Sequence, residues 1–439
     1  MYDSVRHKLG DSNLLFFLFF VFVSYMSICD CLYNQRAWIT YFDYRVRNKH
    51  LGEKESQEFF LFIRNQKYLG ILDRIVTNGF SVPCKKRIQK IESAKKRIVY
   101  TFPQEENYIL KLLTYLLIRK YDSIFSSSLY SFRVNYSVKQ AFQRIVTTPN
   151  ISQYYTYKVD ISDYFNSIDL DILLPRLRNV LCDDQPLYDL IEALLKNPSV
   201  VENGEIKQEN KGVMAGCPIA AFLANVYLLD LDRMFAEENA IYCRYSDDII
   251  IFTKTEEDQK RLKKKLLASL DAYHLKLNTA KEVSTIPNEP WTFLGLKYVN
   301  GQIDVSDIAV KKIKAKMRRK ARALIRWKNR NNRESIHAVK AFIKAFNKKF
   351  YNNTDIHDMT WSRWYFPLIT TDNSLKIIDQ YMQECIRYIA TETHTKSQYN
   401  FRYTQMKELG YQSLVNNWYR FKNDFKNEDF RNRVIWYKL

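Results

Sequence analysis

Two adjacent acids, Asp247 and Asp248, interrupt the apolar stretch "IYCRYSDDIIIF" (241–252). The short β-branched run after them is typical of a buried strand, so the pattern predicts a hairpin with the acids at its turn. Carboxylates are rarely buried unless they are paired or bind a metal, and neighbouring carboxylates repel each other. A divalent cation would remove that repulsion, whereas an isolated Asp-Asp is more often an ordinary polar turn.

A third acid, Asp160, closes another apolar strand, "YYTYKVD" (154–160). Three acids at strand ends suit two-metal phosphoryl transfer, in which two ions about 3.5–4 Å apart clamp the attacking and leaving oxygens. Mg²⁺ prefers hard oxygen ligands and keeps several waters, so a few carboxylates and the substrate phosphates are enough. The sequence therefore predicts two Mg²⁺ ions, with Mn²⁺ as an alternative, bound by Asp160, Asp247 and Asp248.

Several stretches between residues 85 and 300 together resemble the ordered motifs of reverse transcriptases. "YSDD" is similar to their Y-x-D-D motif, and "DISDYFNSI" (160–168) to their first acidic motif. "GVMAGCPIAAFLAN" (212–225) resembles a degraded form of their glycine-rich motif. The remaining similarities are "KKRIVYTFP" (95–103) and "YSFR" (130–133) in the fingers, "LKLNTAK" (275–281), and the primer-grip "FLG" (293–295).

The resemblance implies a role for residues around the acids. It adds Ile161 to the metal ligands. Phe165 would stack under the incoming sugar and exclude a 2′-hydroxyl, the alternative being a plain core aromatic. Gly212 and Gly216 would let the backbone approach the nascent base pair, the alternative being a simple turn. Asp163 is expected to be a turn acid with a minor role.

Basic residues of these motifs would bind the triphosphate or the template. Lys281 would protonate or neutralise the leaving pyrophosphate, or would be a solvated lysine. Arg97 and Lys90 would hold the triphosphate, Arg97 by a bidentate grip. Arg133 is either a template contact or a structural anchor.

The glycine-rich motif departs from the family pattern. Ala215-Gly216 and Ala220-Ala221 stand where reverse transcriptases usually have Gln-Gly and Ser-Pro. Within the bacterial retron and group II intron-like superfamily, this drift resembles the defence-associated, unknown-group enzymes. "MKELGYQSLVNNWY" (406–419) is most similar to their type-2 class. That resemblance implies phage defence and cDNA synthesis on a structured non-coding RNA encoded beside the gene.

The elements that position these motifs alternate between helices and strands and end in a helical tail, which predicts an α+β core followed by an all-α region. The resemblance makes this a right-hand polymerase, with fingers, a palm with an antiparallel RRM-like sheet, and a thumb. Helices are expected over 32–80, 106–121 and 256–275, and hairpins over 82–103 and 292–305, the latter with Asn-Gly at its turn. The predicted domains are an apolar extension (1–31), N-terminal helices and fingers (32–150), the palm (151–305), and the thumb with C-terminal helices (306–439).

The expected thumb begins with a strongly basic helix, 311–333, which holds twelve Lys or Arg and no acid. Its apolar stripe would dock on a core, and its basic face would bind duplex phosphates without reading sequence. The alternative is a solvated charged helix. The predicted stripe is Ile313, Met317, Leu324 and Trp327, and the predicted nucleic-acid contacts are Lys314, Arg318, Arg322 and Lys328.

The composition agrees with a nucleic-acid partner. The 439 residues carry a net charge of +20, and 46% of them are hydrophobic, so the chain is expected to fold and to meet nucleic acid. Seven cysteines without zinc spacing favour a reducing cytoplasm. The apolar stretch 14–26 is too short for a standard span. It is interpreted as an over-extended start before Met26, a membrane anchor or a buried helix.

The sequence thus predicts an RNA-directed DNA polymerase whose partners are a structured RNA template, dNTPs and the cDNA product. No protein partner is evident, and a membrane is not expected. The alternatives are a retired polymerase fold that binds RNA, and a retron or intron enzyme without a defence role.

Overall fold

A computed structural model describes residues 26–47, 51–89, 96–351 and 360–426. The chain divides into two compact units. Unit 1 comprises Met1–Ala141 and Tyr154–Ser284, and unit 2 comprises Phe142–Gln153 and Thr285–Leu439. This division crosses the expected palm and thumb ranges, whose boundaries stay a prediction. Apart from Met26, the apolar stretch 14–26 lies outside the described residues.

The N-terminal helices of unit 1 pack around an aromatic core. Trp38 stacks on Tyr68 with 4.9 Å between ring centroids, and Phe59 stacks on Tyr108 at 4.4 Å. An apolar stripe of α7 is fully buried and consists of Ile109, Leu112, Leu113 and Leu116. The helices predicted over 32–80 and 106–121 are therefore confirmed. They are α3 (Ile28–Tyr33), α4 (Gln35–Arg47), α5 (Glu53–Arg64), α6 (Lys67–Asn78) and α7 (Gln104–Lys120), followed by the 3₁₀ turn η1 (Asp122–Ile124).

The hairpin expected over 82–103 is present as the antiparallel strands β1 (Cys84–Gln89) and β2 (Lys96–Thr101). It belongs to a four-stranded sheet of order β2-β1-β4-β5. The added strands β4 (Ser199–Glu202) and β5 (Glu205–Gln208) were not predicted. The sequence nevertheless contains a turn signal between them, the dipeptide Asn203-Gly204. Both residues take the positive φ that a type I′ turn requires.

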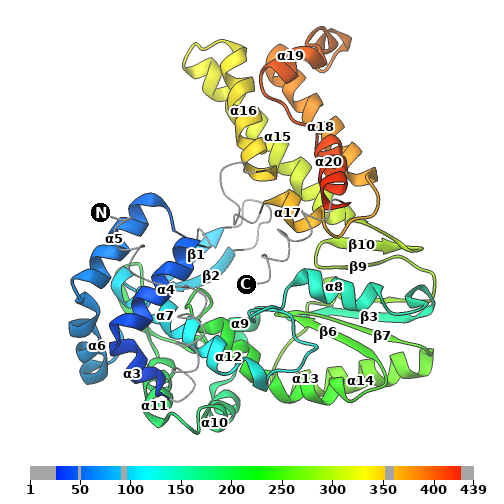
Figure 1. Cartoon of the computed structure of the whole chain (residues 1–439). Coiled ribbons are helices and arrows are strands. Elements are labelled where there is room, and N and C mark those ends of the chain that lie inside the picture. The colour runs from blue at the N-terminus through cyan, green and yellow to red at the C-terminus, as the bar shows by residue number, and fades with distance from the viewer. Residues whose placement is uncertain (1–25, 48–50, 90–95, 352–359, 427–439) are drawn as a thin grey trace. The chain divides into compact units, whose positions relative to one another are not determined.

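The second sheet of unit 1 has the order β6-β7-β3-β8. Its strands are β3 (Tyr155–Asp160), β6 (Ile241–Tyr245), β7 (Asp248–Thr253) and β8 (Val283–Thr285). Central β7 is buried from Ile249 to Thr253, as expected for a run of β-branched residues covered on both faces. The helices α13 (Leu229–Ala236) and α14 (Glu256–Ala272) pack along this sheet (Figure 1). α14 confirms the helix expected over 256–275.

Further short helices complete unit 1. They are α9 (Tyr164–Ser167), α10 (Leu170–Val180), α11 (Gln185–Lys196), α12 (Ala220–Tyr227) and η3 (Thr279–Lys281). Strands and helices both contribute to the core, so the mixed α+β class is confirmed. The chain passes from unit 1 to unit 2 within α8 (Val138–Val146), which is followed by η2 (Ile151–Gln153).

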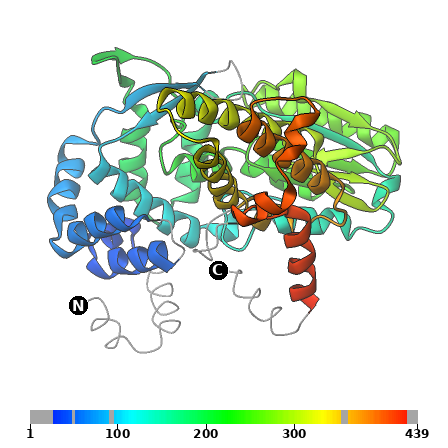
Figure 2. The same ribbon diagram turned by 90° about the horizontal axis from the view of Figure 1, so that it is seen from above.

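Unit 2 holds a small antiparallel sheet and a helical bundle. The sheet consists of β9 (Trp291–Phe293), β10 (Leu296–Val299) and β11 (Gln302–Val305), and β10–β11 is the hairpin predicted with Asn-Gly at its turn. α15, α16 and α18 lie side by side (Figure 2). The helices are α15 (Asp307–Arg330), α16 (Ser335–Phe350), α17 (Trp361–Tyr365), α18 (Asn373–Thr391), η4 (Lys396–Asn400), α19 (Tyr403–Glu408) and α20 (Leu414–Lys426).

The predicted apolar stripe of α15 is correct for three of its four members. Ile313, Met317 and Leu324 are buried, but Trp327 is 43% exposed. The buried series instead continues to Lys328, one residue further round the helix. All seven cysteines are free thiols. In the described part of the chain, no helix is long and apolar enough to cross a bilayer.

Candidate active site

The predicted acidic turn closes the β6–β7 hairpin. Tyr245 pairs with Asp248, which leaves Ser246 and Asp247 as a two-residue turn. Ser246 has φ +59°, the left-handed conformation that the first central residue of a type II′ turn requires. Across the sheet, Asp160 at the end of β3 pairs with Asp248 at the start of β7. The register therefore brings the acids of the two motifs to one end of the sheet.

Burial disfavours the charged form of the turn acids. It raises the pKa of Asp248 to about 6; Lys158 opposes this shift, and the nearby charges of Asp247 and Asp160 add to it. Burial also raises the pKa of Asp247, and the charge of Asp160 raises it further. Asp160 itself is only 4% exposed. A cluster of this kind favours the binding of a cation.

Lys281 supplies one such cation from the protein itself. Its ammonium donates to Asp160 Oδ1 and is about half exposed. The Asn278 side chain donates to the other oxygen, Oδ2, at 3.3 Å, and its backbone N–H donates to the Asp160 carbonyl at 2.8 Å. Lys281 was predicted to act on the triphosphate; here it pairs with a predicted metal ligand.

The acid cluster has the right donors for a divalent metal. Among the described residues, no three His, Cys, Asp or Glu side chains already converge closely enough to hold an ion. The carboxylates of Asp160, Asp247 and Asp248 are nonetheless hard ligands, and the charge of Asp160 is close enough to raise the pKa of both Asp247 and Asp248. Ile161 can add only backbone atoms, because its side chain is buried and apolar; its N–H donates to the Asp247 carbonyl at 3.0 Å. The donor set fits Mg²⁺ or Mn²⁺.

Gly212 fixes the backbone next to the predicted sugar-selecting residue. Phe165 lies in α9, half-buried, with its ring 6.4 Å from that of Phe132. Gly212 has φ +51°, and a Cβ there would lie 2.5 Å from the Phe165 carbonyl oxygen. That oxygen also accepts from the Val213 N–H at 3.0 Å. The close approach that requires glycine is thus to Phe165 and Asn166, whereas the prediction placed a base pair there.

Gly216 makes a similar approach to the fingers strand β2. It has φ +100°, and a Cβ there would lie 2.9 Å from the Tyr100 carbonyl oxygen. The neighbouring Ala215 accepts from the Tyr100 N–H at 2.8 Å and donates to Asn166 Oδ1 at 2.9 Å. Ala215, which stands where the family has Gln, therefore acts through its backbone in tying this loop to β2 and α9.

The predicted basic contacts differ in their surroundings. Arg97 is exposed on β2, and its charge partly offsets the burial that raises the pKa of Asp247. Lys90 lies outside the described residues. Asp163 is a turn acid: it takes φ +46° and accepts from the Asn166 side chain at 3.0 Å.

Arg133 corrects the predicted nucleic-acid set. Its side chain is 4% exposed and lies 3.8 Å over the Tyr136 ring. Its five N–H groups all donate within the protein, to the Asp122 carboxylate and to the carbonyls of Asp122, Ser126 and Leu129. This geometry favours the structural-anchor alternative over a template contact, because a guanidinium has only five N–H donors.

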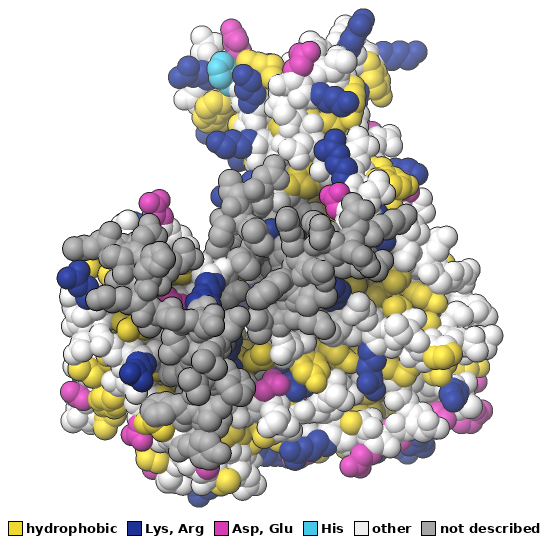
Figure 3. All heavy atoms as spheres, viewed as in Figure 1, with side chains coloured by type: hydrophobic (Ala, Val, Ile, Leu, Met, Phe, Trp, Pro, Cys, Tyr) yellow, Lys and Arg dark blue, Asp and Glu magenta, His cyan; other side chains and the backbone are white. Residues whose placement is uncertain are grey.

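The structure also corrects the basic face predicted for α15 in unit 2, because only some of its predicted residues are exposed. Arg318 and Arg322 are exposed as expected. Lys314 lies 4.4 Å over the Tyr381 ring and is half-buried. Lys328 is 8% exposed and forms an ion pair with Glu392, so it was wrongly placed on the phosphate-binding face. Lys and Arg side chains are frequent on the helices of unit 2 in Figure 3.

Comparisons with known proteins identify the domain that carries the acids. Residues 88–298 match the family model described as reverse transcriptase (RNA-dependent DNA polymerase). The chain contains a reverse transcriptase domain. The matched range includes Asp160, Asp247 and Asp248, and reverse transcriptases are RNA-directed DNA polymerases. The matched range covers the whole β6-β7-β3-β8 sheet and, of the other sheet of unit 1, β2, β4, β5 and the end of β1.

Similar solved structures include telomerases of Candida. Apo telomerase from Candida tropicalis truncated from its C-terminal domain matches with 14% identity and a TM-score of 0.43, over 52% of this chain and 55% of that chain. Apo telomerase from Candida tropicalis matches with 12% identity and a TM-score of 0.44, over 75% and 68%. The chain therefore spans about half to two thirds of the telomerase chains it matches. No curated protein sequence matches it.

Proposed function

We propose that this protein synthesises DNA on an RNA template at Asp160, Asp247 and Asp248. The observation that carries the proposal is the β3–β7 register, in which Asp160 faces Asp248 with Asp247 in the adjoining turn. The reverse transcriptase domain supplies the reaction class. The alternative, a retired polymerase fold that only binds RNA, would not need this cluster of buried, mutually repelling acids.

Each of these residues is proposed to have a separate role in nucleotide addition. The three carboxylates would hold two divalent ions, which supply Lewis-acid stabilisation when bound. The primer 3′-hydroxyl would lose its proton to solvent, and its oxygen would attack the α-phosphorus of a dNTP, forming one P–O bond as the bond to pyrophosphate breaks. Lys281 holds a proton on Nζ beside Asp160 and would pass it to the leaving pyrophosphate. Arg97, exposed on β2, would bind the triphosphate, and Lys90 is proposed with it.

The decisive experiment replaces the acids without changing their shape. Asp247→Asn, Asp248→Asn and Asp160→Asn should each abolish dNTP incorporation on a primed RNA template while the circular dichroism spectrum and RNA affinity persist. Asp304→Asn, in strand β11 of unit 2, is the matched control and should retain synthesis. Synthesis by any of the three variants above about 1% of wild type would contradict the assignment, and a wild-type protein that binds RNA but makes no cDNA would favour the retired fold.

Phe165 is proposed to select the sugar. Its half-buried ring lies beside the Phe132 ring, and its backbone carbonyl lies against Gly212. Phe165→Val should open space for a 2′-hydroxyl and raise the ratio of rNTP to dNTP incorporation. Phe132→Leu, which removes a neighbouring ring without placing a β-branched residue at φ +57°, is the comparison. An unchanged ratio in Phe165→Val would show that this residue is not the gate.

A structured RNA is the proposed template. The net charge of +20 and the exposed Arg318 and Arg322 of α15 suit a phosphate backbone. Reversing both arginines to Glu should weaken RNA binding and flatten the dependence of affinity on salt, by about 0.7–0.9 in slope per lost contact. Lys328→Met is the control for helix damage, because Lys328 is buried on the other side of α15 and the change breaks its ion pair with Glu392. An unchanged slope after the reversal would make α15 a solvated surface.

The biological role is proposed from the departures in the glycine-rich motif and the C-terminal resemblance. They support a bacterial, cytoplasmic enzyme of phage defence that copies a non-coding RNA into cDNA. Sequencing the RNA and DNA that co-purify with the wild type and with Asp247→Asn would test this. One dominant structured RNA in both samples, with its complementary DNA only in the wild type, is expected. Loss of phage protection in Asp247→Asn would then tie the defence to synthesis.

A further inference from the structure

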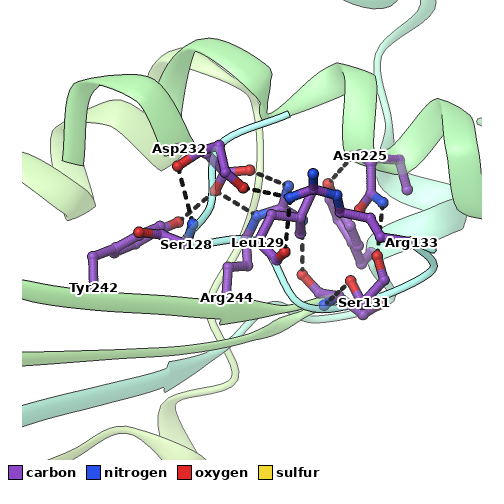
Figure 4. Close-up of polar contacts among 12 residues, drawn as sticks. Ser128, Leu129, Ser131, Arg133, Asn225, Asp232, Tyr242 and Arg244 are labelled. Atoms are coloured by element: carbon purple, nitrogen blue, oxygen red, sulfur yellow. Dashed lines mark hydrogen bonds and ion pairs between the residues drawn. The ribbon is translucent and has the colours of Figure 1, made fainter. Parts of the chain in front are cut away.

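The catalytic turn rests on a buried arginine that the sequence comparison did not single out. We propose that Arg244 and Asp232 form a positioning pair that holds the Ser246-Asp247 turn in its working geometry (Figure 4). This inference rests on the proposed role of Asp247 and Asp248. It assigns Arg244 no contact with substrate; Arg244 acts through the turn.

The guanidinium of Arg244 uses its fork to join two elements. Nε and Nη2 donate to the two carboxylate oxygens of Asp232, on α13, at 2.7 and 2.5 Å. Nη1 donates to the backbone carbonyl of Ser246, inside the turn, at 3.2 Å. Both charged side chains are fully buried. The Tyr242 hydroxyl also donates to Asp232, at 2.8 Å, which fixes the carboxylate from the other side.

A second set of hydrogen bonds links the same turn to the segment 128–133. The Ser246 N–H donates to Ser131 Oγ at 2.8 Å, while the Ser131 carbonyl accepts from the Asn225 side chain at 3.0 Å. The backbone of Arg244 pairs with this segment through its N–H to Ser128 and its carbonyl to Tyr130, at 3.0 and 2.9 Å. Both backbone polar groups of Ser246 are thus held by side chains, the carbonyl by Arg244 of β6 and the N–H by Ser131 from outside the hairpin.

The chemistry of the pair indicates positioning more than stability. A buried ion pair is a weak stabiliser, since apolar residues of similar size often serve as well. Only a planar fork can hold a carboxylate with two donors and still direct a third at the turn carbonyl. The turn needs such support because Ser246 occupies a left-handed conformation that costs a serine energy. Arg244 therefore fixes the residue directly before Asp247.

The critical variant is Arg244→Lys, which keeps the buried positive charge beside Asp232 but has no fork to reach the Ser246 carbonyl. We expect kcat for nucleotide addition to fall about 10- to 100-fold, the usual range for groups that orient a ligand, with KM for dNTP and RNA affinity unchanged. Hydrogen exchange of the backbone amides in 245–250 should become faster. A second variant, Arg244→Met with Asp232→Asn, removes both charges together, so that neither is left buried alone, and should show the same kcat defect.

A matched control separates positioning from general destabilisation. Arg74→Met with Glu106→Leu removes another ion pair of unit 1, whose carboxylate is 1% exposed, and should lower the melting temperature without changing kcat. Unchanged kcat and unchanged exchange in Arg244→Lys would overturn the positioning role, as would an equal kcat loss in the control. Failure of the proposed function looks different: the wild type itself, or Asp247→Asn, would then give the unexpected result.

Discussion

Two hairpins of this molecule have two-residue turns that are built from different kinds of residue. In unit 2, β10 and β11 are joined by Asn300 and Gly301, which take φ +46° and +81°. These are the residue types that a type I′ turn selects, because both tolerate positive φ. In unit 1, β6 and β7 are joined by Ser246 and Asp247, and only Ser246 takes positive φ. Neither is a strong turn former of that kind.

The two turns differ in which residues determine their backbone conformation. The Asn-Gly turn is specified by its own two residues. The Ser-Asp turn is held by side chains outside the turn itself: Ser131, far away in the sequence, accepts from the Ser246 N–H, and Arg244, on β6, donates to the Ser246 carbonyl. Because Asp247 is needed for its carboxylate, the residues of this turn are not the ones that best favour a two-residue turn. The surrounding structure then supplies what the turn sequence lacks.

The largest expected effect comes from a β-branched residue at the left-handed position of each turn. Ser246→Val should cost about 1–3 kcal/mol in strain and lower kcat about 100-fold, because the shift displaces Asp247. Gly301→Val, at φ +81°, should cost similar stability with kcat unchanged. Single-nucleotide incorporation and thermal melting measure both. Equal kcat losses would mean that the two turns contribute alike to catalysis.

A smaller effect is expected from removing one distant support in each unit. Ser131→Ala should leave the buried Ser246 N–H without its acceptor, costing about 1–3 kcal/mol, and should lower kcat about tenfold. Ser131→Thr keeps the hydroxyl and should be near wild type. Thr370→Ala removes the corresponding hydroxyl acceptor of Ile303 N–H in β11 and should cost stability only. A kcat loss in Thr370→Ala would contradict the distinction.

The last prediction concerns folding stability alone, without metal: whether an Asp→Asn change raises or lowers the free energy of unfolding. Because the pKa of Asp248 is raised to about 6 in the folded chain, the folded state binds more protons than the unfolded state between about pH 4 and 6. Stability therefore falls as pH rises through this window. Asp248→Asn should stabilise the chelator-treated protein by on the order of 1–3 kcal/mol at pH 8, and the gain should vanish toward pH 4.

Asp304→Asn, in the other hairpin, should have the opposite sign. Asp304 Oδ2 accepts from the Ser374 N–H at 3.0 Å, so its carboxylate is supported by a donor. Its replacement should cost about 1 kcal/mol. Urea unfolding in chelator at pH 8 and pH 5 measures both variants. A stabilising Asp304→Asn, or a destabilising Asp248→Asn at pH 8, would contradict this account of the acid cluster.

The same contrast explains what the sequence could predict. The Asn-Gly hairpin, the long amphipathic helices and the acids at strand ends depend on local patterns, and the structure has them where they were expected. Lys328 could not be distinguished from Arg322 by pattern, because both are basic and only the partner Glu392, far along the chain, separates them. Arg244 was visible as a charge within an apolar strand. Its partner Asp232 lies on a different element, α13, so no spacing rule would give the pair.

The discontinuous composition of unit 2 has a consequence for synthesis on the ribosome. Phe142 packs 5.5 Å from Trp291, and the Asn288 N–H donates to the Ser152 carbonyl at 2.6 Å, all within unit 2. Residues 142–153 leave the ribosome roughly 150 residues before these partners, an interval of roughly 7 to 30 s at about 5–20 residues per second. During that time the apolar face of Phe142 lacks its native cover. The second half of α8 therefore cannot reach its native packing until translation has passed Trp291.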